Sequence, residues 1–163
     1  MMRWLKRVRP DDEVAPAAPT TRRDDPAALH ESLADLVSMI NSHAGHMPTR
    51  AVVEARRLTD TLGEIVDTAS SRPLDTYAVI SLHSTMDDYL PTTLQRYLAL
   101  DPAQRTQPSG QGLSGNDALL QQIEVLQQSV SASLEAVRQH DAQALMIQGS
   151  FLETRFSGSD LDL

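Results

Sequence analysis

The chain has 163 residues and no cysteine, so disulfides, thiolate metal sites, iron–sulfur clusters and a cysteine nucleophile are excluded. The absence of cysteine fits a reducing compartment, and we expect a soluble cytoplasmic protein. Aromatic residues make up only 4% of the chain, so a core must come from aliphatic side chains, which suit helix-on-helix packing. We predict an all-α fold: one antiparallel helical bundle of four to five helices with a long C-terminal coiled-coil-like helix.

The net charge of −8 is unevenly distributed along the chain. Residues 1–23 contain six Lys/Arg and three Asp/Glu, a net charge of +3, whereas the rest contains eight and 19, a net charge of −11. So acidic a body argues against nucleic-acid binding, which needs a positive face. No run reaches the roughly 20 apolar residues of a membrane span, and no apolar run follows the N-terminal charges as in a secretory signal peptide.

Residues 1–25 combine a basic start with a Pro/Ala-rich stretch, and the composition predicts disorder. If Met1–Arg9 formed a helix, Trp4 would share one side with other apolar residues, among cationic residues such as Lys6 and Arg7. This pattern predicts contact with the inner face of a membrane, because basic charge attracts anionic lipid. The alternative is a disordered basic segment that aids solubility.

The first helix is predicted to begin at Asp25-Pro26, because aspartate is a frequent N-cap and proline fits the first helical position. Gly45 is expected to end it. A second helix begins near Pro48-Thr49, with Val52 and Val53 in its predicted buried stripe, and ends before Pro73. The turn between the two helices is short, so they should pack antiparallel.

The third helix is predicted over residues 74–90, with Tyr77 and Ile80 among its candidates for burial. Pro91 removes a backbone donor, yet apolar spacing continues in phase through Leu100. Either a kinked helix or a new helix starting at Pro91 satisfies this pattern. Residues 101–116 are rich in Pro, Gly, Gln and Ser and predict a flexible, disordered loop.

The last helix is predicted from Asn116 or Asp117 to Arg155, with apolar residues spaced alternately by four and three. Ser133 and His140 interrupt this seam, so packing within a bundle is expected rather than an autonomous zipper. The bundle domain therefore covers residues 26–156, and residues 157–163 form an acidic tail.

His83 and Asp87 lie four residues apart, a spacing that metal sites use. A metal site needs more ligands than this pair supplies, so a hydrogen-bonded or solvated pair is the preferred interpretation. Ser81 and Ser84 lie in no nucleophile elbow, and no phosphate-binding glycine motif is present. The sequence therefore predicts no catalytic residue, no metal ligand and no cofactor.

The run Asp87-Asp88-Tyr89-Leu90-Pro91 is the most particular local pattern. Its two carboxylates could bind a basic partner or a cation, or could face water beside a kink. Residues 86–100, which read MDDYLPTTLQRYLAL, resemble the D-Y-L-P-x-x-L-x-x-Y-x-x-L stretch of the bacterial XpaC-like family. That family is labelled for hydrolysis of a halogenated indolyl phosphate and is associated with toxic-anion resistance. The resemblance implies a bacterial helical bundle with a kinked central helix, and it transfers no active site.

We therefore expect a non-enzymatic interaction or adaptor protein that binds a protein partner, in an envelope- or stress-related assembly; a homo-oligomer is compatible with this. Six residues on the two amphipathic segments are the candidates for partner contact: Asp87, Asp88, Tyr89, Tyr97, Leu126 and Val137. Two alternatives stay open. One is a hydrolase, as the resembled family implies, and the other is a membrane-surface adaptor anchored by residues 1–9.

Overall fold

The computed structural model describes residues 24–108, 110 and 112–157, and every regular element within them is helical. The prediction of an all-α fold is thus confirmed for this part of the chain. The α-helices are α1 (Pro26–His43), α2 (Thr49–Ser71), α3 (Thr76–His83), α4 (Leu90–Leu98), α5 (Pro102–Thr106) and α6 (Gly115–Ser157). A 3₁₀ turn, η2 (Ala44–His46), follows α1, and a π-helical segment, η3 (Ser84–Tyr89), joins α3 to α4.

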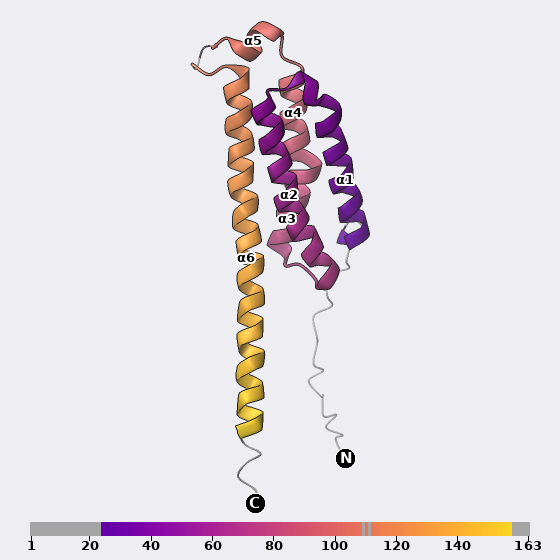
Figure 1. The fold of residues 1–163 in the computed structure, drawn as a ribbon, viewed down its shortest axis with the longest axis vertical. Helices are drawn as coiled ribbons and strands as arrows, with labels where there is room; N and C mark the ends of the chain where they lie inside the picture. The colour runs from indigo at the N-terminus through magenta and orange to yellow at the C-terminus, as the bar shows by residue number, and fades with distance from the viewer. Residues whose placement is uncertain (1–23, 109, 111, 158–163) are drawn as a thin grey trace, which may run out of the picture.

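Figure 1 shows α1, α2, α3 and α4 lying side by side, with α6 running along them and continuing well past their end. Helix α5 lies across the opposite end, between α4 and α6. The closest packing of α6 is against α2, and it also contacts α3 and α4. Helix α1, in contrast, packs mainly against α2.

The core is aliphatic, as the low aromatic content requires. Every long helix contributes fully buried Leu, Ile or Val side chains, and Tyr97 is the single aromatic residue among the buried ones described. Burial of each such side chain stabilises the fold by roughly 1.5–3 kcal/mol. The fully buried large side chains are Leu29, Ile40, Leu58, Leu62, Ile65, Leu82, Leu90, Leu94, Ile123, Val66, Val130 and Val137.

Three residues predicted to be buried are exposed instead. Val53 is 54% exposed on α2, and Tyr77 and Ile80 are exposed on α3. The buried faces of these helices pass through Ala51 and Ala55 and through Ala78 and Leu82. Small alanines thus lie at the close contacts between helices, and larger apolar neighbours lie on the outer face. The spacing of apolar residues alone does not show which of the two faces is buried.

The start of α6 differs from its prediction. The helix begins at Gly115 rather than at Asn116 or Asp117, and the buried Ser114 caps it. The Asp117 backbone N–H donates to Ser114 Oγ (3.2 Å), and Asp117 Oδ2 accepts from the Ser114 hydroxyl and backbone N–H. This reciprocal arrangement satisfies donors at the helix start that would otherwise lack partners.

The predicted loop 101–116 is helical over Pro102–Thr106, so the prediction of an unstructured segment was wrong there. Arg105 is the reason, because its guanidinium nitrogens donate to the carbonyls of Leu98 (2.9 Å), Leu100 (3.1 Å) and His46 (3.2 Å). One guanidinium thus donates hydrogen bonds to three backbone carbonyls near helix ends. Composition gives no sign of this contact, because His46 lies far away in the sequence.

Candidate functional site

Helix geometry around Pro91 determines what the third and fourth helices present to solvent. The Leu90 N–H donates to the Thr85 carbonyl, five residues back, and Pro91 enters in the first turn of α4. A π turn contains one more residue than an α turn, so the chain absorbs the proline without leaving the helix. Of the two predicted solutions, the structure has a continuous helical path with a π segment before Pro91.

Three consecutive residues of the π segment lie on the surface. Asp87, Asp88 and Tyr89 are exposed between the buried Met86 and Leu90. This is the run that the sequence singled out. Together these three residues form an exposed acidic-aromatic cluster just before Pro91.

An open hollow of about 470 Å³ lies between this cluster and α6, and we call it the apolar groove. Its apolar side chains are Tyr89 (54% exposed), Val125 (57% exposed) and the half-buried Leu126. Across the groove wall, Thr93 Oγ1 donates to Gln122 Oε1 (3.1 Å), which ties α4 to α6. The lining residues are Tyr89, Thr93, Gln121, Gln122, Val125 and Leu126.

Two of the predicted contact residues thus meet in one place, because Tyr89 and Leu126 both line the apolar groove. Asp88 adjoins it in the sequence, and its carboxylate accepts a hydrogen bond from Thr92 (3.1 Å). Val125 also lines the groove, although it is not among the six residues predicted to contact a partner. It lies one residue outside the regular apolar seam, and only the packing of α4 against α6 places it in a groove.

The other predicted contact residues have structural positions. Val137 is buried in the core, so its side chain is not available to a partner. Tyr97 is buried as well, and its hydroxyl donates to Asn116 Oδ1 (2.8 Å) while the Arg105 guanidinium lies 5.2 Å from its ring centroid. Tyr97 therefore joins α4 to α5 and α6.

Asp87 belongs to a short network centred on His83. One ring nitrogen of His83 lies 2.9 Å from Asp87 Oδ2, and the other lies 2.9 Å from Asp24 Oδ1. The two carboxylates flank opposite edges of the ring, so they hold the start of the described chain against α3 rather than converge on one point. Among the described residues, no group of three or more His, Asp or Glu could hold a metal ion.

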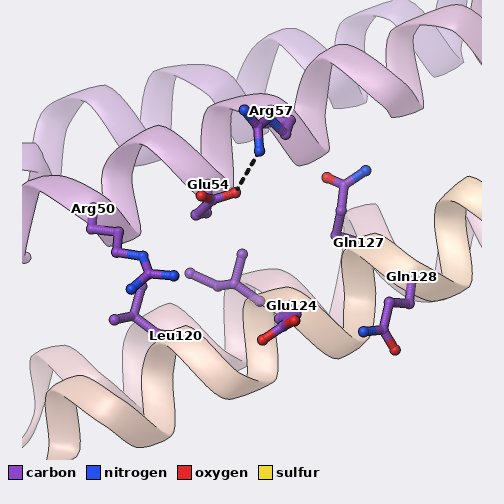
Figure 2. Close-up of a pocket in the computed structure, with 8 residues that line it drawn as sticks. Arg50, Glu54, Arg57, Leu120, Glu124, Gln127 and Gln128 are labelled. Carbon is purple, nitrogen blue, oxygen red and sulfur yellow. Dashed lines mark hydrogen bonds and ion pairs between the residues drawn. The ribbon is translucent and has the colours of Figure 1, made fainter.

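A second hollow, of about 310 Å³, lies between α2 and α6 and is charged rather than apolar (Figure 2). Arg50, Glu54 and Arg57 line it from α2, and Glu124 and Gln127 line it from α6 together with Leu120, Ile123 and Gln128. Figure 2 shows Arg57 paired with Glu54 inside this hollow, at 3.3 Å. Its charges of both signs balance, which gives no preference for an anionic or a cationic ligand.

Gln127 forms the inner wall of the charged hollow. Its Nε2 donates to Thr61 Oγ1 and to Ser131 Oγ, both at 3.0 Å, while its Oε1 is buried without a hydrogen-bond partner in the described part of the chain. In the sequence, Arg50, Glu54 and Arg57 indicate only the polar face of one helix, so the pattern does not reveal this hollow. Pairing of α2 with α6 is needed to form it.

Trp4, Lys6 and Arg7, predicted to contact a membrane, lie outside the described residues. In residues 24–157, apart from 109 and 111, no helix combines the length and apolar content needed to cross a membrane.

Comparison with known proteins found no matching protein-family model, and no similar protein among curated sequences or solved structures.

Proposed function

We propose that this chain is a non-enzymatic interaction protein that binds an amphipathic helix of a protein partner in the apolar groove. The observation that carries the proposal is the convergence of Tyr89, Val125 and Leu126 on one open hollow. Aromatic side chains exposed on a surface are enriched at protein interfaces, and apolar grooves between two helices accept the apolar face of a third. The Thr and Gln residues of the lining supply polar groups for the rim of such an interface.

The charge of the protein specifies the partner further. Residues 24–163 carry eight Lys/Arg and 19 Asp/Glu, and Asp87 and Asp88 immediately precede the groove residue Tyr89. A partner helix with Lys or Arg beside its apolar face would be attracted to this surface and oriented on it. An acidic helix would be repelled. The occupant we propose is therefore a basic amphipathic helix.

The proposal includes the finer architecture. An antiparallel bundle, with α6 as a long coiled-coil-like helix, would keep the groove rigid, and the short connection through η2 between α1 and α2 supports this arrangement. The cytoplasmic location, the bacterial source and the envelope- or stress-related role stay predictions. So does the resemblance of residues 86–100 to the XpaC-like family.

The test is capture of partners by the full-length protein from cells of its source, followed by reconstitution with the purified partner. Val125→Lys places a cation in the groove, and Val53→Lys places one at an equally exposed position on α2 outside both hollows. We expect one helical, basic partner to bind the unaltered protein and Val53→Lys, and to bind Val125→Lys at least tenfold more weakly. Equal binding to both variants, or binding of an acidic partner only, would overturn the proposal. Thermal unfolding of each variant confirms that the fold is intact.

A further inference from the structure

The far end of α6 extends beyond the rest of the described molecule. We call residues 24–141 the body of the protein. Arg72 is where α2 last holds α6: its Nη2 donates to the Val137 carbonyl (3.0 Å), and its guanidinium forms an ion pair with Asp141. Val137 is also the last buried residue of α6 among those whose side chains are described. Residues 142–157 continue the helix with no other described element beside them (Figure 1), and we call them the α6 extension.

The α6 extension keeps the apolar character of the buried part of the helix. Met146 is 74% exposed and Ile147 is 65% exposed. In the sequence, the spacing by three and four that contains Val130 and Val137 continues through Ala144, Ile147 and Phe151. Inside the body this face is covered by α2, α3 and α4, whereas along the extension no described residue covers it. An apolar helix face left in water is a site for association.

A free helix of this length is also only marginally stable, because tertiary packing supplies most of the stability of helices in proteins. The extension has 16 residues, about 24 Å of helix. Packing of its apolar face against another helix would stabilise the helical state that the structure shows. Both the short length of the α6 extension and the exposure of its apolar side chains thus favour pairing with another helix.

The distribution of charge indicates which helix packs on the apolar face of the α6 extension. Residues 24–141 carry seven Lys/Arg and 16 Asp/Glu, a net charge of −9, whereas the extension carries one Glu and one Arg and is neutral. Two copies of the body carry a net charge of the same sign, so they repel one another at close range. The α6 extension is neutral, so two copies can meet there without net repulsion, and it projects away from the acidic body. A basic partner, by contrast, gains nothing from a neutral segment.

We propose that the α6 extensions of two copies of this chain pack together and make the protein a homodimer. The interface is isologous, so each copy contributes Ile147 and the residues in phase with it. A helix pair of this length buries little area for a stable complex, so we expect a dimer that dissociates on dilution. The dimer would present two apolar grooves, which raises the apparent affinity for a partner that carries two binding helices.

Sedimentation velocity of the full-length protein over a wide concentration range tests the proposal. We expect a monomer–dimer equilibrium for the unaltered protein and for Val125→Lys, which alters α6 beside the body. Ile147→Lys introduces one cation per copy into the interface, and it should weaken dimerisation at least tenfold while the thermal unfolding midpoint of the body stays unchanged. A monomer at every concentration, or unchanged dimerisation of Ile147→Lys, would overturn the proposal.

Cross-linking supplies a second readout, because the natural chain has no cysteine. Ile147→Cys should form a disulfide-linked dimer in mild oxidant much faster than Val53→Cys, whose position on α2 is similarly exposed. Equal rates for the two variants would contradict pairing through the extension. Val125→Lys separates this proposal from the preceding one, since it should lose the partner but keep the dimer.

Discussion

Arg72 donates a hydrogen bond from Nη2 to the backbone carbonyl of Val137, 3.0 Å away, at the point where the body of the protein ends and the α6 extension begins. The same guanidinium pairs with Asp141 one turn further along the helix. A residue just after α2 therefore contacts α6 at the last turn where α6 has a buried side chain among those described. The surface of α6 before this point is shared with other helices, and the surface after it is open.

Arg72→Met should lower the free energy of unfolding by about 1–2 kcal/mol, because a charge-assisted hydrogen bond to a backbone carbonyl is lost while the aliphatic stem is kept. Urea titration measures the change. The control is Arg57→Met, which removes an exposed pair with Glu54 and should cost less than about 1 kcal/mol. Equal effects of the two substitutions would mean that Arg72 does not hold α6 as the geometry indicates.

Gly115→Ala should lower the free energy of unfolding by about 1–3 kcal/mol, as overpacking does elsewhere. A Cβ at this position would lie 2.7 Å from Leu100 Cδ1 and 3.0 Å from the backbone of Arg105 and Gln104, so α5 would have to move. Gly63→Ala is the matched control, because its Cβ would only touch Leu33 Cδ2 at 3.6 Å. We expect Gly63→Ala to stabilise the protein by about 0.5–1 kcal/mol through higher helix propensity. Thermal or urea unfolding of both variants would reveal the opposite signs; the same sign for both would contradict the close approach at Gly115.

Val137→Lys should prevent stable folding, because it buries an unpaired cation in the core. Val125→Lys lies 12 residues earlier on α6 but is exposed, and it should change the free energy of unfolding by no more than about 0.5 kcal/mol. Circular dichroism during thermal unfolding compares the two. A folded Val137→Lys protein with an unchanged midpoint would show that α6 packs in a different register.

His30 should make a small pH-dependent contribution to stability. Its pKa is raised above the usual value of 6.5, because the ring hydrogen-bonds to the Pro26 carbonyl (2.7 Å) and to the Asp67 carboxylate (3.1 Å). The protonated ring is thus favoured in the folded state. The stabilisation is fully present below pH 6.5 and is lost as pH rises through the higher folded-state pKa.

Urea unfolding of the unaltered protein and of His30→Gln, at pH 6 and pH 8, measures this contribution. The difference in stability between the two proteins should be larger at pH 6 and should stay below about 1 kcal/mol, since the pair is exposed. A difference that grows toward pH 8 would contradict the assigned direction. The comparison with His30→Gln cancels the titration of the other four histidines.

The sequence by itself determined the all-α class, the aliphatic core and most helix ends. These follow from local chemistry: Pro26 and Pro48 cannot continue a preceding helix, and apolar residues at helical spacing have only one face to bury. The prediction that the helical path could survive Pro91 rested on the phase of Leu94 and Leu98. These features depend on neighbours along the chain, which a sequence displays directly.

The tertiary structure decided everything that depends on two helices at once. Tyr89 and Leu126 share a groove only because α4 packs against α6, and Val137 is a core residue only because α6 packs against the rest of the bundle at that turn. An apolar residue on an amphipathic helix looks the same whether it faces the core or a partner. What distinguishes the two is where the covering helices end, and that is set by long-range packing rather than by the period of the pattern.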